Sequence, residues 1–180
     1  MQASPKSGYD AAQRDAKMLR GDVLDLFAQF ERAASPVFAR AAALPEYKVH
    51  KPVLPHLLGQ KLERLRTLMS EAGPLRSRAS RHEVAPLLDR LSKFESLRHF
   101  MAHGTVEVAL MQSGEPIYVF SMTCAASDGF SDATLALSRR EAQSRRARLA
   151  DTVGALKSKL EAITDDMDKP PRHRADAHIG

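Results

Sequence analysis

Apolar residues recur every three or four positions over four stretches of the chain, the spacing that returns to one face of a helix. The stretches cover residues 10–44, 55–72, 83–103 and 138–164. Ser35-Pro36 interrupts the first stretch. Because proline fits the first turn of a helix and serine often precedes it as N-cap, this dipeptide predicts a kink or a restart. Four amphipathic helices predict a bundle built around one apolar core.

The period of the pattern changes after the third helix. Residues 105–111 alternate in part between apolar and polar side chains, and residues 117–123 are rich in types that favour strands. The segment between them contains Gly114, which favours a turn. A β-hairpin is therefore expected at about 105–124, and residues 132–137 are compatible with a short further strand. The predicted fold class is mainly α, a helical bundle with a small β-hairpin before the C-terminal helix.

Local signals mark the boundaries of the third and fourth helices. Gly104 follows the last residue of the third helix, a position where a left-handed residue often ends a helix and glycine fits without steric cost. Ser138 and Glu141 have the spacing of a capping box, with serine as the N-cap and glutamate three residues later. The last helix is thus expected to begin directly after Ser138.

Length and composition fit one globular domain. With 180 residues, 43% of them hydrophobic, the chain is long enough to bury a core and too apolar to be disordered throughout. The domain is expected to cover residues 10–165, between a flexible N-terminus (1–9) and a disordered tail (166–180). No stretch resembles a membrane span or a secretion signal, and the single Cys124 excludes an internal disulfide or a multi-cysteine zinc site. These features predict a cytoplasmic protein without membrane association.

Positive charge is concentrated near the start of the last helix. The chain has a net charge of +5, and residues 139–148 contain five arginines against one acid. A basic helix end is often only a solvated surface, yet it also suits an anionic partner such as RNA. The candidate RNA-binding residues are Arg139, Arg140, Arg145 and Arg146.

The end of the third helix combines one arginine with two histidines. On a continuous helix, Arg98 falls within the apolar stripe, where an unpaired guanidinium is costly. His99 and His103 are four residues apart and are therefore neighbours at the edge of that stripe. Arginine stays charged and can hold a phosphate, while histidine can take a proton from a ribose 2′-hydroxyl or give one to the leaving oxygen. The set suits metal-independent cleavage of RNA, because RNA supplies its own nucleophile.

The stretch from Arg98 to Gly104 (RHFMAHG) resembles the motif of HEPN domains, which is an arginine, a polar residue, a few residues and a histidine, often ending in Ala-His-Gly. The order of elements from about residue 80 to 165 is also similar. The resemblance implies a HEPN-like helical bundle that forms a homodimer and brings two motifs together across a cleft. It assigns catalysis to Arg98 and His103, with His99 in a supporting position.

Many HEPN domains are metal-independent endoribonucleases of toxin–antitoxin or antiphage-defence systems. The resemblance therefore implies an endoribonuclease without a cofactor. Its implied partners are RNA, a second copy of the chain and, in some systems, an antitoxin or a nucleotidyltransferase. Other HEPN domains are non-catalytic modules that bind RNA or protein, and this alternative stays open.

Each feature of the motif also has a structural interpretation. Arg98 could pair with Asp89, with Glu95 or with an acid of another helix, and so tie the bundle together. His103 could interact with the dipole at the helix C-terminus. Under these interpretations the chain is a helical interaction protein. The spacing of His99 and His103 would also suit a metal, although no third ligand lies nearby in the sequence.

Overall fold

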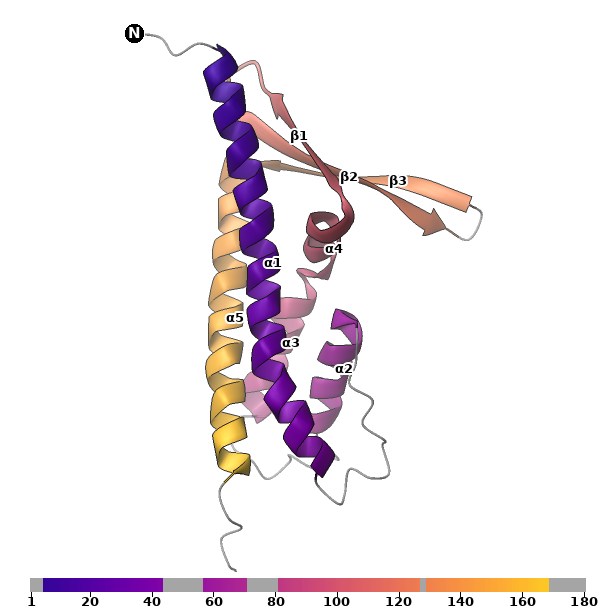
Figure 1. Cartoon of the computed structure of the whole chain (residues 1–180), viewed down its shortest axis with the longest axis vertical. Helices are drawn as coiled ribbons and strands as arrows, with labels where there is room; N and C mark the ends of the chain where they lie inside the picture. The colour runs from indigo at the N-terminus through magenta and orange to yellow at the C-terminus, as the bar shows by residue number, and fades with distance from the viewer. Residues whose placement is uncertain (1–4, 44–56, 71–80, 127–128, 169–180) are drawn as a thin grey trace, which may run out of the picture.

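The computed structural model describes residues 5–43, 57–70, 81–126 and 129–168, which form five helices and three strands (Figure 1). The helices are α1 (Pro5–Ala43), α2 (Leu58–Met69), α3 (Arg81–Ser92), α4 (Glu95–His103) and α5 (Arg139–Met167). The strands are β1 (Thr105–Leu110), β2 (Pro116–Ala126) and β3 (Gly129–Ser138). The mainly helical fold class, with a small sheet before the C-terminal helix, is confirmed. Residues 1–4 and most of the expected tail, 169–180, lie outside the described residues.

The two longest helices, α1 and α5, lie side by side and run in the same direction (Figure 1). Three ion pairs join them: Asp15 with Arg139, Asp22 with Arg146 and Arg40 with Asp168. The partners follow the same order along both helices, as a parallel arrangement requires. Helix α3 contacts α5, and α4 contacts α1, so the short helices complete the bundle around this pair.

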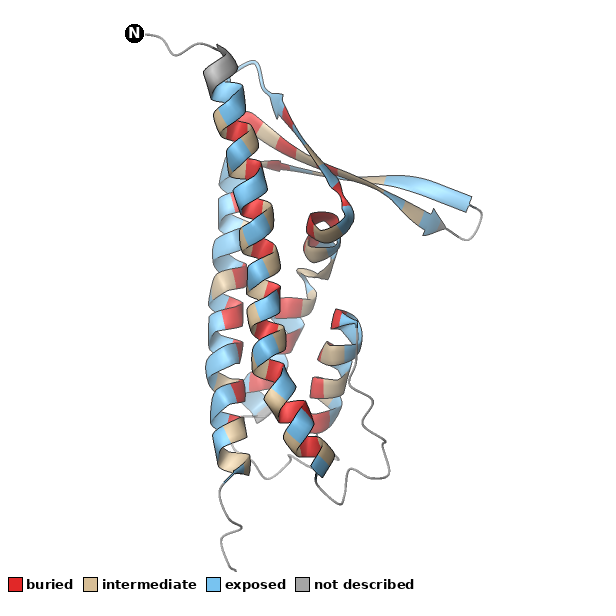
Figure 2. Cartoon of the chain, in the orientation of Figure 1, coloured by how far each residue is buried: buried red, intermediate tan, exposed pale blue. Residues whose placement is uncertain are grey.

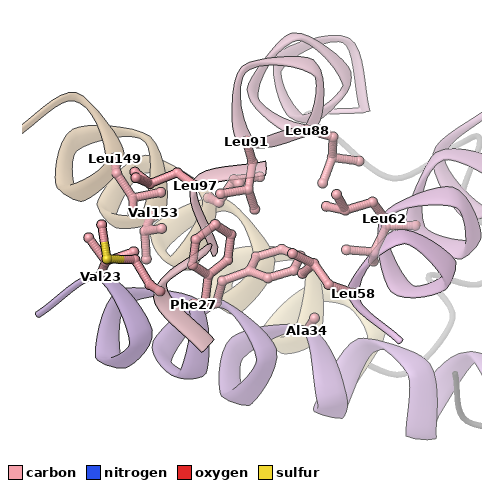
Figure 3. Close-up of a cluster of buried hydrophobic side chains, with 14 of the residues drawn as sticks. Val23, Phe27, Ala34, Leu58, Leu62, Leu88, Leu91, Leu97, Leu149 and Val153 are labelled. Carbon is pink, nitrogen blue, oxygen red and sulfur yellow. The ribbon is translucent and has the colours of Figure 1, made fainter. Parts of the chain in front are cut away.

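The core consists of aliphatic and aromatic side chains from all five helices, with a smaller contribution from the sheet. Figure 3 shows the part of this cluster where α1 meets the other helices. Its labelled members include Val23, Phe27, Leu62, Leu91, Leu97, Leu149 and Val153. Phe27 is 1% exposed, and its ring lies between α1 and the facing helices. The apolar stripes expected from the sequence therefore meet in one core.

Helix α1 is a single element that passes through Pro36, so of the two outcomes expected there, a kink or a restart, the restart does not occur. The helix begins at Pro5, ahead of the expected start at residue 10. Figure 1 shows the axis of α1 bending toward its C-terminal end, and a proline inside a helix is a common cause of such a bend. The Ser35 hydroxyl donates a hydrogen bond to the carbonyl oxygen of Glu31 at 2.8 Å instead of capping a new helix.

The third predicted helix is divided into α3 and α4, so the expectation of one helix from 83 to 103 was wrong. The Phe94 N–H donates to the carbonyl oxygen of Leu91 at 3.0 Å, a bond one residue shorter than in an α-helix. The backbone of Phe94 has φ −100° and ψ 3°, which is outside the helical region. Helix α4 starts directly afterwards, because the Arg98 N–H donates to the Phe94 carbonyl oxygen.

The hairpin prediction is confirmed for β1 and β2, which pair from Leu110 opposite Pro116 to Thr105 opposite Ser121. The sheet is larger than one hairpin, because β3 pairs with β2 over its whole length and gives the order β1-β2-β3. The far ends of β2 and β3 project from the helices, and Figure 2 shows them largely exposed. Phe130 of this projection is 83% exposed.

The capping box at the start of α5 is confirmed. The Ser138 hydroxyl accepts from the Glu141 N–H at 3.3 Å, and the Glu141 carboxylate accepts from the Ser138 N–H at 3.0 Å. The backbone N–H and the hydroxyl of Ser138 both donate to the Glu141 carboxylate, and these two bonds lower the pKa of Glu141. Over the described part of the chain, every helix is too short or too polar to cross a membrane.

Candidate functional site

The C-terminal end of α4, which bears the two motif histidines, is fastened to α1 by Arg20. The two terminal nitrogens of Arg20 donate to the carbonyl oxygens of Gly104 and Ala102, each at 3.1 Å. The last carbonyls of a helix lack partners within the helix, so these bonds fix its end and the side chains on it. The sequence contained no signal for this contact, because Arg20 is separated from both carbonyls by more than eighty residues.

Gly104 is in an extended conformation, with φ −75° and ψ 152°, so the expectation of a left-handed cap was wrong. Its glycine identity has a different cause. A Cβ atom at this position would lie 2.6 Å from the carbonyl oxygen of Phe100 and 3.3 Å from that of Ser121. The last turn of α4, together with the neighbouring strand β2, therefore leaves no room for a side chain.

Gly104→Ala is expected to destabilise the fold by about 1–3 kcal/mol, because backbone atoms must move to relieve the contact with Phe100. Urea unfolding followed by circular dichroism measures this change. Gly154→Ala is the matched control, since a Cβ there meets nothing within 4 Å on an exposed helical surface. The control is expected to be neutral or to stabilise by up to about 1 kcal/mol. Equal unfolding curves for both variants would contradict the close approach at Gly104.

His99 and His103 lie next to each other on the exposed surface of α4. Their ring centroids are 4.9 Å apart, and the ring planes meet at 63°. The spacing of four residues on a helix produces this arrangement, as the sequence predicted. The end of α4 thus presents two imidazoles to solvent, close enough to act on one small group.

Arg98 is partly buried and faces an acid of another helix. Its guanidinium lies 3.7 Å from one carboxylate oxygen of Glu31 in α1, and the other oxygen accepts from Lys61 of α2 at 2.5 Å. Of the acids considered from the sequence, Asp89 instead pairs with Arg66. The contact with Glu31 agrees with the structural interpretation of the sequence, in which Arg98 pairs with an acid of another helix.

The pairing of Arg98 is incomplete. A separation of 3.7 Å is too long for a hydrogen bond, and among the described residues no group accepts a hydrogen bond from its side chain. Its Nε atom is buried without a partner there. A buried N–H without an acceptor is costly, so the guanidinium retains donors that an anion would satisfy.

Within a single chain, the side chains of Arg98, His99 and His103 do not all point to the same side of α4. Arg98 and His103 are five positions apart, which is about 140° around a helix. The structure brings His99 and His103 together and turns Arg98 toward Glu31.

The four candidate RNA-binding arginines have different surroundings. Arg139 donates to the Tyr118 hydroxyl and also pairs with Asp15, and these bonds raise its pKa. Arg146 pairs with Asp22 at 2.6 Å. Arg140 is exposed, whereas Arg145 lines a groove between α5, α4 and β3. Two of the four therefore join helices within the chain.

Over the residues that the structure describes, no group of three or more histidine, cysteine or acidic side chains is arranged to hold a metal ion. Comparisons of the chain with protein-family models, with curated proteins and with solved structures find no match. The class that the structure defines is a mainly helical bundle with a three-stranded sheet before its last helix. The resemblance to HEPN domains therefore stays a prediction from the sequence motif and the order of the elements around it.

Proposed function

We propose that the protein is a HEPN-like, metal-independent endoribonuclease that acts as a homodimer. The observation that supports this most directly is the pair of exposed imidazoles at the end of α4, with ring centroids 4.9 Å apart. Of two neighbouring histidines, one can act as the general base and the other as the general acid in phosphodiester cleavage.

The proposed reaction uses the ribose 2′-hydroxyl as nucleophile. One neutral imidazole takes the 2′-hydroxyl proton while the 2′-oxygen bonds to phosphorus. The bond from phosphorus to the 5′-oxygen of the next nucleotide breaks, and the other, protonated imidazole gives that oxygen its proton. The products are a 2′,3′-cyclic phosphate and a 5′-hydroxyl, so protons and electrons balance without a metal.

Arg98 is proposed to stabilise the negative charge of the phosphate during this reaction. Its guanidinium has hydrogen-bond donors that Glu31 does not use, and about one third of its side chain is exposed. A phosphate provides the short, charge-assisted bonds that the 3.7 Å contact lacks. The homodimer is proposed to bring two copies of the motif to one cleft, as the resemblance implies.

The biological setting is also a proposal from the resemblance. It comprises a toxin or antiphage-defence role in the cytoplasm and association with an antitoxin or a nucleotidyltransferase.

Incubation of the purified protein with RNA in excess EDTA tests the proposed function. Cleavage is expected to proceed, and its products are expected to end in a 2′,3′-cyclic phosphate and a 5′-hydroxyl. RNA with 2′-O-methyl riboses is expected to resist, because it lacks the nucleophile. A requirement for a divalent metal, or products with 5′-phosphates, would contradict the mechanism. Analytical ultracentrifugation checks the dimer, and a monomer at assay concentration would contradict the composite site.

The second candidate is a non-catalytic HEPN-like module that binds RNA or protein. It is favoured by the contact between Arg98 and Glu31, which holds the arginine within the bundle. Under this candidate the dimer binds a partner and leaves RNA intact. If RNA is that partner, its affinity falls steeply with salt.

A further inference from the structure

A groove separate from the exposed histidines runs between α5, the junction of α3 and α4, and strand β3. It has a volume of about 470 Å³, which is within the range of sites for small ligands. Its basic lining residues are Arg90, Lys93, Arg145 and Arg148, and Asp151 is the acidic residue that lines it. We call this feature the α5 groove. Four positive charges against one negative charge give it an electrostatic preference for anions.

The cations of the α5 groove differ from several other basic residues on or near α5. Arg40 and Arg146 are each paired with a carboxylate, as is Lys159 of α5 with Glu83. By contrast, within the described ranges none of the four groove cations forms an ion pair. Arg148 donates only a long bond, 3.4 Å, to the carbonyl oxygen of Ser144. Arg145 interacts electrostatically with Glu141, but among the described residues no carboxylate lies within ion-pair distance of any of the four.

The α5 groove also provides apolar surface beside these charges. Phe94 and Leu135 line it and are half-buried, so part of each side chain is still open to a ligand. A basic groove with an aromatic side chain is the usual combination in sites for single-stranded nucleic acids, where cations track the phosphates and a base stacks on the ring. A simple inorganic anion would make no use of the aromatic surface.

The groove and the exposed histidines are connected along one face of α4. Ser96 lines the groove, and His99 and His103 follow it at intervals of three and four residues, so all three lie on the same side of the helix. At about 1.5 Å per residue, His99 is about 4.5 Å further along the helix axis than Ser96. This is a short enough span for consecutive nucleotides of one strand to cover.

From these observations we infer that the α5 groove binds single-stranded RNA, holding a nucleotide next to the phosphate that reaches His99 and His103. The inference rests on the proposed function for the position of that phosphate and adds the substrate class. Arg145 and Arg148 contact the backbone phosphates, and Phe94 stacks against a base. A duplex is excluded from this role because its bases are not free to stack on the ring.

Fluorescence anisotropy with a short, labelled, single-stranded RNA bearing 2′-O-methyl riboses measures binding without cleavage. The double variant Arg145→Ala/Arg148→Ala is expected to bind about tenfold or more weakly than the wild type. Its slope of log affinity against log salt is expected to be smaller by about 1.4, because each lost phosphate contact removes about 0.7. Phe94→Leu keeps an apolar side chain and is expected to weaken binding about fivefold or more.

Lys157→Ala is the matched control, because Lys157 belongs to the same helix but pairs with Glu161 outside the groove. It is expected to bind like the wild type apart from the small general effect of one lost charge. Equal affinities for the groove variants and this control would overturn the inference. Tighter binding of a duplex of the same sequence, or absence of binding by the wild type, would overturn it as well.

Cleavage of ordinary RNA, measured in parallel, separates this inference from the proposed function. If the wild type cleaves RNA and the groove variants bind and cleave equally well, the groove assignment is wrong and the nuclease remains. If the wild type binds through the groove but leaves RNA intact, the groove assignment stands as a binding site and the nuclease proposal fails.

Discussion

His103→Ala is expected to reduce the rate of RNA cleavage by about 10²- to 10⁴-fold, the usual contribution of a general acid or base. His103 is exposed at the end of α4, so its removal leaves the core intact and the free energy of unfolding nearly unchanged. Single-turnover cleavage of a labelled RNA measures the rate, and urea unfolding measures the stability.

His82→Ala serves as the control for this substitution. It removes another exposed helical histidine, which lies in α3 rather than in the motif, and it is expected to keep the wild-type cleavage rate. If His103→Ala cleaves RNA as fast as His82→Ala, then His103 has no catalytic role. A loss of stability in His103→Ala matching its loss of activity would instead assign the residue to the structure of the helix end.

Phe27→Ala is expected to lower the free energy of unfolding by about 3–5 kcal/mol, the cost of truncating a large buried aromatic side chain. Phe27 is 1% exposed and lies where α1 meets the other helices (Figure 3). Removal of the ring leaves a cavity in the core and also removes packing contacts with several helices. Urea unfolding monitored by circular dichroism measures the change.

Met18→Ala provides the comparison for Phe27 on the same helix. Met18 is 66% exposed, so its truncation is expected to change the free energy of unfolding by no more than about 0.5 kcal/mol. A loss below about 1 kcal/mol in Phe27→Ala would mean that α1 does not pack as described.

Local sequence patterns were sufficient to predict several parts of the fold. The capping box depends on two residues three positions apart, and the hairpin depends on strand-forming residues around a short turn, so both could be predicted. On α1 the spacing alone did not decide between Leu26 and Phe27. Both residues continue the spacing from Val23, and only the position of the neighbouring helices makes Phe27 buried and Leu26 half-buried.

Features that depend on distant partners were not predictable from local patterns. The apolar stripe runs through the break at Phe94 without interruption, so periodicity indicated one helix where the structure has two. The glycine at position 104 was assigned to a left-handed turn, whereas the actual reason is the Phe100 carbonyl oxygen 2.6 Å from where a Cβ would lie, with the Ser121 carbonyl of β2 at 3.3 Å. Periodicity describes one helix at a time and cannot show which backbone will approach it.

In the candidate site, too, some features were predictable from local spacing and others required the tertiary structure. The neighbouring positions of His99 and His103 follow from helical spacing and were predicted. The position of Arg98 on the inner side of the helix was also predicted. Its partner Glu31, and the contact of that acid with Lys61, bring together three helices and required the tertiary structure.

The parallel arrangement of α1 and α5 has a consequence for how the chain folds as it is synthesised. Asp15 and Arg139, which meet at one end of the pair, are 124 residues apart in sequence. At about 5–20 residues per second, translation needs roughly 6–25 s to pass from one to the other. Throughout that time the surface of α1 that α5 later covers has no native partner. The nascent chain is therefore most vulnerable to aggregation before its last helix leaves the ribosome, and stop codons upstream of α5 leave that surface permanently uncovered.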